Sequence, residues 1–164
     1  MGYPATCRLG NQEAGKKEED TWLHQLDSYR EKYPNEAKEL ERLIQGSLPA
    51  DIEKTINNLI EKFESDTSDY ATRKCSGICL DSIGPIMPEL IGGSADLSPS
   101  NNTEWKGTTH LKKDGTGNYL NYGVREFGMS AIMNGMVLHG GIRPYAGTFL
   151  TFLDYARNAV RMSA

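Results

Sequence analysis

Glu126 is the residue of this chain best suited to chemistry, because it stands at the start of an apolar segment that continues over residues 130–138. Three aromatic residues follow at intervals of three, Phe149, Phe152 and Tyr155. If they lie on a helix, the three rings share roughly one face, with successive rings about 60° apart around the axis. A carboxyl group beside an aromatic wall suits a flat, nitrogen-containing ring, since the acid can hydrogen-bond a ring nitrogen while aromatic rings stack on its faces.

Both features also have simpler structural explanations. An acid in the first turn of a helix is favoured by the helix macrodipole, a contribution of ~0.3–1 kcal/mol. Aromatic residues at helical spacing are core residues in most proteins. The residue types alone therefore leave a ring-binding site and ordinary packing both open.

Two motifs resemble the start of the pyrimidine-binding domain of transketolase. One covers residues 123–129, Gly-Val-Arg-Glu-Phe-Gly-Met, and the other covers residues 92–101, Gly-Gly-Ser-Ala-Asp-Leu-Ser-Pro-Ser-Asn. The resemblance implies that thiamine diphosphate is the cofactor and that Glu126 is a catalytic acid. It also implies that three aromatic residues form the pocket for the cofactor's aminopyrimidine ring, with the second of them stacked on the ring: Phe149, Phe152 and Tyr155.

The resemblance gives the acid a defined task. In the family a carboxyl group shares a proton with a ring nitrogen of the cofactor, and the aminopyrimidine then takes the proton from C2 of the thiazolium. Such an acid needs an apolar setting, because desolvation favours the protonated carboxyl. The neighbours expected to supply this setting are Gly123, Val124, Phe127, Met129 and Ile132.

Three further polar residues match the family. Asp96, in the Gly-rich turn, corresponds to an aspartate near the cofactor and the subunit contact. Arg73 and Ser100 correspond to residues that bind the phosphate of the sugar substrate. A guanidinium group can fork onto two phosphate oxygens, and a hydroxyl group adds a third hydrogen bond. Since an aspartate in a turn often caps its own loop and a surface arginine is often solvated, these roles rest on the resemblance.

A metal-binding motif of the family is missing from the sequence. Thiamine diphosphate enzymes of this type hold the diphosphate through Mg²⁺ on a Gly-Asp-Gly loop, and no Gly-Asp-Gly occurs here. Mg²⁺ needs oxygen ligands and bridges phosphate to protein. We therefore expect no metal ligands in this chain, and we interpret it as an internal fragment of a transketolase whose Mg²⁺ ligands lie elsewhere. The isolated chain is predicted to be inactive.

The elements that position these residues predict an α/β fold. Residues 70–83 have the pattern of a helix, and residues 88–93 that of a short strand leading into a Gly-rich turn. Residues 101–118 are polar and turn-rich, so we expect them to run over the surface. The succession of helix, strand, Gly-rich loop, helix, strand and helix predicts a parallel sheet whose strand ends carry the ligands.

Before these elements, three amphipathic helices are expected, beginning near Asp20, Pro34 and Asp51. They could form a small partner-binding bundle. The resemblance implies instead that residues 1–69 are the helical tail of a preceding domain and a linker. Residues 70–164 would then be the N-terminal part of an incomplete pyrimidine-binding domain. We expect the first ten residues to be frayed.

Composition excludes several classes of protein. The net charge of −4 gives no long-range attraction for nucleic acid or an anionic membrane surface. No apolar run approaches the ~20 residues of a membrane span. The three cysteines, Cys7, Cys75 and Cys79, are too few and too unevenly placed for a disulfide framework, which predicts a cytoplasmic protein. Cys75 and Cys79 are expected to pack on a helix as small apolar residues.

Three functions remain open at this point. The first is that of a transketolase segment, in which the intact enzyme transfers a two-carbon ketol unit between sugar phosphates and a second subunit completes the active site. Dihydroxyacetone synthase is a close relative of transketolase, and this segment does not distinguish the two. The second is a non-catalytic module that binds or heterodimerises with a full-length transketolase-like partner. The third is a truncated gene product with no function of its own.

Overall fold

The computed structural model describes residues 5–164, with side chains from residue 12 onward. Within it the chain divides into two compact units, Met1–Arg42 and Leu43–Ala164. The side chain of Cys7 and the first four residues lie outside the described part. None of the described helices is long and apolar enough to cross a membrane.

Two helices account for the first unit, α1 (Ala5–Lys32) and most of α2 (Pro34–Ile44). The start of α2 at Pro34 is as predicted, but α1 begins well before Asp20. The expected cap at Asp20 is therefore wrong, because the preceding run of Glu, Lys, Gln and Ala consists mostly of good helix formers. Arg30 joins the two helices, since its guanidinium pairs with Asp27 at 2.6 Å and with Glu41 at 2.5 Å.

The second unit begins with α3 (Ile52–Ser65), which packs against α4 (Thr72–Ile83). A short 3₁₀ helix, η1 (Gly84–Ile86), follows α4. Between α3 and α4 the predicted polar linker is held by one carboxylate. Asp66 accepts hydrogen bonds from the backbone N–H of Ser68 at 2.9 Å and the hydroxyl of Tyr70 at 2.7 Å. Both bonds lie within the linker, just before α4 begins at Thr72.

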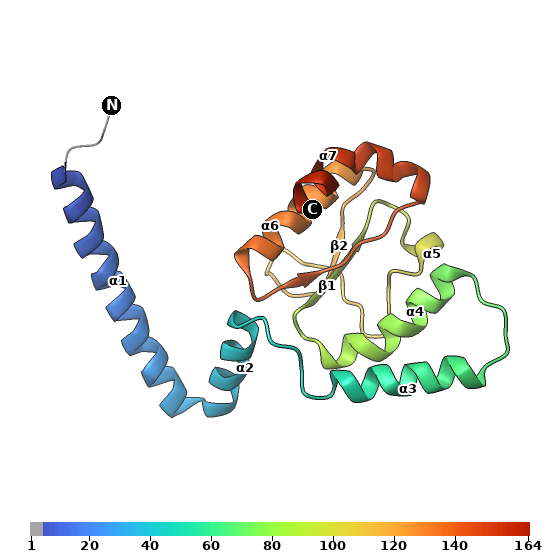
Figure 1. The fold of residues 1–164 in the computed structure, drawn as a ribbon, viewed down its shortest axis with the longest axis horizontal. Coiled ribbons are helices and arrows are strands. Elements are labelled where there is room, and N and C mark those ends of the chain that lie inside the picture. The colour runs from blue at the N-terminus through green and yellow to red at the C-terminus, as the bar shows by residue number, and fades with distance from the viewer. Residues whose placement is uncertain (1–4) are drawn as a thin grey trace. The chain divides into compact units, whose positions relative to one another are not determined.

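Three short parallel strands form the sheet, β1 (Leu90–Ser94), β2 (Tyr119–Asn121) and β3 (Arg143–Pro144). Their order is β2-β1-β3, with Gly93 opposite Leu120 and Leu90 opposite Arg143. The predicted α/β architecture with a parallel sheet is thus confirmed. Figure 1 shows α6 and α7 on one side of this sheet and α3 and α4 on the other.

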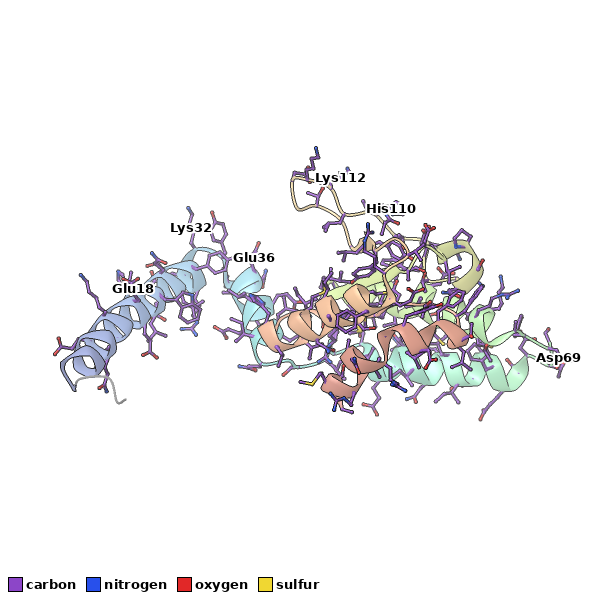
Figure 2. The ribbon with its side chains drawn as sticks, turned by 90° about the horizontal axis from the view of Figure 1, so that it is seen from above. Glu18, Lys32, Glu36, Asp69, His110 and Lys112 are labelled. Atoms are coloured by element: carbon purple, nitrogen blue, oxygen red, sulfur yellow. The ribbon has the colours of Figure 1, made fainter. Side chains whose placement is uncertain are left out.

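The connections between strands carry the remaining elements. Between β1 and β2 lie α5 (Ser98–Asn101) and a long excursion, and Figure 2 shows Lys112 at the tip of a loop that stands clear of the helices. From β2 the chain crosses to the other side of β1 through α6 (Glu126–His139). After β3 come the 3₁₀ helix η2 (Leu150–Phe152) and α7 (Leu153–Ser163), which packs on α6.

The sheet and α6 share a small core. Ala95, Tyr122 and Met129 are buried together, with Leu120 and Met133 packed against them. The ring of Tyr122 lies directly over Gly93, where a Cβ would overlap the ring and stand 2.9 Å from the carbonyl oxygen of Leu120. Gly93 therefore lets an aromatic ring approach the central strand.

We expect Gly93→Ala to lower the free energy of unfolding by about 1–3 kcal/mol, because the added methyl group overpacks the contact with Tyr122. Gly135→Ala is the matched control, since a Cβ at Gly135 on α6 meets nothing within 4 Å. It should raise stability by up to about 1 kcal/mol through helix propensity alone. Urea unfolding of the two variants measures this difference, and equal effects would contradict the assigned contact.

Candidate functional site

Candidate residues follow all three parallel strands at the same edge of the sheet. Asp96 comes after β1, Glu126 after β2 and Phe149 after β3. In parallel α/β sheets ligands bind beyond the carboxyl ends of the strands, because loops from neighbouring strands meet there. The structure therefore places three of the predicted site residues beyond the strand ends at this edge, Asp96 and Phe149 in connecting segments and Glu126 at the start of α6.

Glu126 is the first residue of α6, and only 7% of its surface is exposed. Among residues 12–164 no group donates a hydrogen bond to its carboxylate or forms an ion pair with it. Burying such a group without a partner is costly, although the free N–H groups of the first helical turn favour an acid there. The carboxyl group is thus available to a hydrogen-bonding ligand.

The apolar setting predicted around Glu126 is only partly present. Met129, one turn later on α6, is 4% exposed, as expected. Val124 is 75% exposed and Phe127 52% exposed, so these two neighbours do not enclose the acid within this chain. They flank the helix start and point outward, and enclosure on that side would have to come from another surface.

The turn before α6 fixes the direction of Glu126. Gly123 has a φ of 64°, in the left-handed region that favours glycine. Its carbonyl oxygen accepts a hydrogen bond from the backbone N–H of Arg125 at 2.8 Å. The Arg125 guanidinium folds back and donates to the carbonyl oxygen of Tyr122 at 2.8 Å. The turn is therefore held from both sides before the helix begins.

The three aromatic residues form a continuous ladder. The ring centroids of Phe149 and Phe152 are 5.7 Å apart with 26° between the planes, and those of Phe152 and Tyr155 are 6.1 Å apart at 35°. The expectation of a single helical face is wrong for Phe149, whose backbone is extended with ψ 147°. The rings of Phe149 and Phe152 nevertheless stack across the 3₁₀ turn η2, and Tyr155 continues the row from the first turn of α7.

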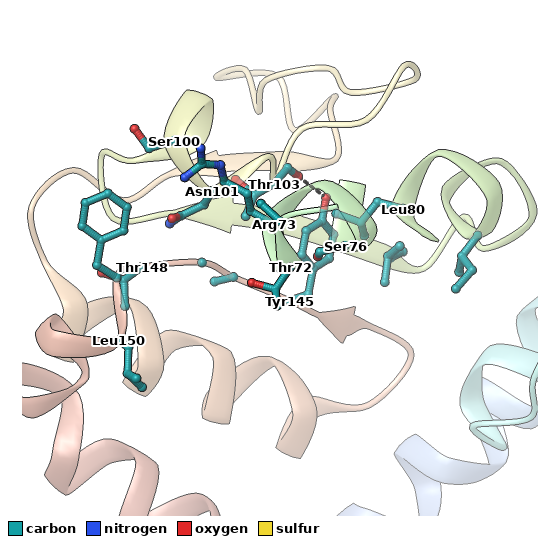
Figure 3. A pocket seen from close by; sticks show the side chains of 16 residues that line it. Thr72, Arg73, Ser76, Leu80, Ser100, Asn101, Thr103, Tyr145, Thr148 and Leu150 are labelled. Atoms are coloured by element: carbon teal, nitrogen blue, oxygen red, sulfur yellow. Dashed lines mark hydrogen bonds between the residues drawn. The ribbon is translucent and has the colours of Figure 1, made fainter. Parts of the chain in front are cut away.

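A pocket of about 700 Å³ brings the two predicted phosphate-binding residues together. Its lining includes Arg73 from the first turn of α4, Ser100 from α5 and Phe149 from the ladder. Figure 3 shows the Arg73 guanidinium beside Ser100 and Asn101. The pocket thus joins the predicted phosphate site to the first ring of the ladder, whereas Asp96 and Glu126 do not line it.

Two further polar groups of this pocket were missed by sequence reasoning. The Asn101 side-chain nitrogen and the Thr148 hydroxyl are buried without a hydrogen-bond partner. Their only sequence signal is that each is adjacent to a predicted site residue. Tyr145 was also missed; its hydroxyl donates to the carbonyl oxygen of Thr103 at 2.7 Å, and burial, followed by the nearby Tyr119 and Glu104, raises its pKa.

Asp96 occupies a strained backbone conformation. Its φ is 62°, uncommon for a residue other than glycine, and its side chain is exposed. The next backbone N–H, of Leu97, is held by the Ser94 hydroxyl at 3.0 Å. Conformations of this kind cost of order 1–3 kcal/mol and often occur at functional sites.

The cysteines of α4 do not form a metal site with other residues of the described part. Cys75 and Cys79 lie on α4 as half-buried free thiols, which fits their expected packing role. Within the described residues, no three His, Cys, Asp or Glu side chains gather closely enough to hold a metal ion.

Comparison with known proteins identifies similar chains. The family model described as transketolase, pyrimidine binding domain, matches residues 68–164. Transketolase 2 and transketolase 1 of Escherichia coli (strain K12) are 50% and 47% identical over 152 residues, covering 93% of this chain. This chain spans only 23% of the length of each of these relatives.

Solved structures give the same result. Transketolase from Pichia stipitis in complex with sedoheptulose-7-phosphate superposes with a TM-score of 0.86 and 38% identity, covering 99% of this chain and 25% of that one. Transketolase from Leishmania mexicana superposes with a TM-score of 0.82 and 37% identity, covering 93% of this chain and 22% of that one.

The carboxylate of Asp66, in the linker before the helix that carries Arg73, gives a testable prediction. Hydrogen bonds from Ser68 and then Tyr70 lower the pKa of Asp66 from 3.8 to about 2. We expect Tyr70→Phe to raise that pKa, because the ionised carboxylate loses one donor. A ¹³C NMR titration of the Asp66 carboxyl measures it. Ser65→Ala is the control, since the Ser65 hydroxyl donates to the carbonyl oxygen of Lys62 and not to Asp66. An unchanged titration midpoint of Asp66 in Tyr70→Phe would refute the hydrogen bond between Tyr70 and Asp66.

Proposed function

Because this chain belongs to the transketolase family by its pyrimidine-binding domain, we propose that residues 123–155 bind the aminopyrimidine ring of thiamine diphosphate. We further propose that the whole protein transfers a two-carbon ketol unit between sugar phosphates. The observation that carries the proposal is the buried, unpartnered carboxyl of Glu126 at the strand edge that also bears the aromatic ladder.

The residues present fit such a ring. Glu126 offers a buried carboxyl group for a ring nitrogen, and Phe149, Phe152 and Tyr155 offer parallel or tilted faces for stacking. When bound, thiamine diphosphate supplies a nucleophilic carbon that protein side chains lack. Glu126 would hold a proton at its carboxyl oxygen toward the ring nitrogen, and Phe152, central in the ladder, would orient the ring.

The other matched residues take supporting roles in the proposal. Arg73 and Ser100 would bind the phosphate of a sugar phosphate, which is supported by their place in one pocket. Asp96 would lie near the cofactor, as its position after β1 supports. Mg²⁺ ligands would belong to other parts of the whole protein. In Pichia stipitis the related enzyme has been crystallised with sedoheptulose-7-phosphate and, as a variant, with fructose-6-phosphate.

A second subunit is part of the same proposal. Helix α6 is mostly apolar, yet Val137 is 61% and Leu138 87% exposed. A helix of this kind is normally covered. The same surface also supports the alternative that the chain is a non-catalytic module which heterodimerises with a full-length transketolase-like partner. Cofactor binding by this chain favours the first function, whereas partner binding without cofactor binding favours the second.

Domain limits and location complete the proposal. We assign residues 70–164 to the pyrimidine-binding domain and residues 1–69 to a helical tail and linker. The family match over residues 68–164 supports the first assignment. A cytoplasmic location is supported by the small number of cysteines, three in 164 residues.

Calorimetric titration of the chain with thiamine diphosphate and Mg²⁺ tests the cofactor site. We expect Glu126→Gln to weaken binding by about tenfold to a hundredfold through loss of a charge-assisted hydrogen bond. Phe152→Ala should weaken it by about tenfold through loss of stacking. Tyr33→Ala, an aromatic residue on the first unit between α1 and α2, should bind as the unchanged chain does. No heat from the unchanged chain at millimolar cofactor would overturn the proposal.

Titration of the chain with inorganic phosphate, followed by NMR, tests the phosphate site. We expect Arg73→Gln to weaken binding by at least about tenfold, because a bidentate charge-assisted contact is lost. The control is Lys74→Gln, which removes the adjacent positive charge of α4, outside the pocket lining. Equal losses of affinity in the two variants would mean that phosphate binding depends only on net charge, which would contradict the proposed phosphate site.

A further inference from the structure

Tyr119 connects both ends of the segment that carries Ser100. It is the first residue of β2 and is fully buried, with 0% of its surface exposed. Its hydroxyl lies 2.6 Å from the hydroxyl of Ser98, where α5 begins. The same hydroxyl lies 2.6 Å from the hydroxyl of Thr103, just beyond the end of α5. One phenol group therefore holds residues 98–103 at both ends.

That segment has few bonds of its own to hold its conformation. Helix α5 has only four residues, too few for a helix to be stable by itself. Asn102 at its end has a φ of 51°, in the left-handed region. External bonds therefore add to the order of the segment, and in the described part of the chain the Tyr119 hydroxyl is the group that bonds to both of its ends.

The segment is packed against the helix that carries Arg73. Gly77 lies one turn after Arg73 on α4, so the two share a face. A Cβ at Gly77 would lie 3.3 Å from the Cβ of Asn102, which shows how closely α4 approaches the segment. A shift of residues 98–103 would therefore change the distance between Ser100 and Arg73.

A second tyrosine supports the same segment from the pocket side. The Tyr145 hydroxyl donates to the carbonyl oxygen of Thr103 at 2.7 Å, a bond drawn in Figure 3. It holds only the far end of the segment. At the near end Tyr119 bonds to Ser98, next to Leu97, whose backbone N–H donates to the Ser94 hydroxyl.

We propose that Tyr119 is a positioning residue for phosphate binding: its hydroxyl holds residues 98–103 so that Ser100 stands opposite Arg73 before a phosphate group arrives. The inference rests on the proposed phosphate site and adds a residue that touches neither phosphate nor sugar. A pre-ordered site binds more tightly because the ligand does not have to order the segment.

Phosphate titrations of the full chain by NMR test this role. Tyr119→Phe keeps the buried ring and removes both hydrogen bonds, so phosphate should bind about tenfold more weakly. Tyr122→Phe is the matched control, because the Tyr122 hydroxyl is buried without a partner, and its phosphate affinity should be unchanged. Amide signals of α6 and α7 should keep their positions in both variants, which separates a local effect from unfolding.

A second variant keeps the test valid if Tyr119→Phe does not fold. Thr103→Val removes one of the two bonds and leaves the tyrosine ring in place, so affinity should fall by about threefold. Where both variants fold, the double variant should bind phosphate as weakly as Tyr119→Phe alone, because Tyr119→Phe already removes the bond between Tyr119 and Thr103. Additive losses would overturn the inference.

The outcomes separate the inference from the proposed function. If the unchanged chain binds phosphate, Arg73→Gln weakens binding and Tyr119→Phe does not, the inference is wrong and the phosphate site stands. If Tyr119→Phe is unfolded and Thr103→Val binds as the unchanged chain does, the inference is likewise wrong. If the unchanged chain does not bind phosphate, both are wrong.

Discussion

Two adjacent glycines of the central strand decide how the candidate site is built. Side chains alternate between the faces of a strand, so Gly92 and Gly93 open opposite faces of β1. The phenol ring of Tyr145 occupies the space beside Gly92, and the ring of Tyr122 occupies the space beside Gly93. Any larger side chain at either position would displace an aromatic ring and the loop that carries it.

Each ring belongs to a different half of the site. Tyr145 lines the pocket with Arg73 and Ser100 and supports the end of the α5 segment through Thr103. Tyr122 packs with Met129 in the core beneath the start of α6, where Glu126 is buried. The rings of Tyr145 and Tyr122 therefore lie on opposite faces of one strand, and the same short sheet fixes the position of both.

The sequence predicted the α/β architecture and the family, because those signals are local, and the site residues stay predictions. Glycine-rich turns, proline starts and helical spacing gave the order of elements, and the motifs around Asp96 and Glu126 carried the family resemblance. The start of α1 was wrong because Asp20 can serve as a cap or as a helix interior residue. The hydrogen bonds of Tyr119, Thr103 and Tyr145 could not be predicted, since they join residues from separate loops and leave no periodic pattern.

The left-handed backbone at Asp96 has a consequence for how this position can change over time. The backbone at Asp96 has a shape that few amino acids accept, and the role we propose for Asp96 near the cofactor would also need its negative charge. Asparagine would satisfy the shape without the charge, glutamate the charge without the shape, and glycine only the shape. Each of these three substitutions at position 96 would therefore lose either the left-handed backbone conformation or the negative charge.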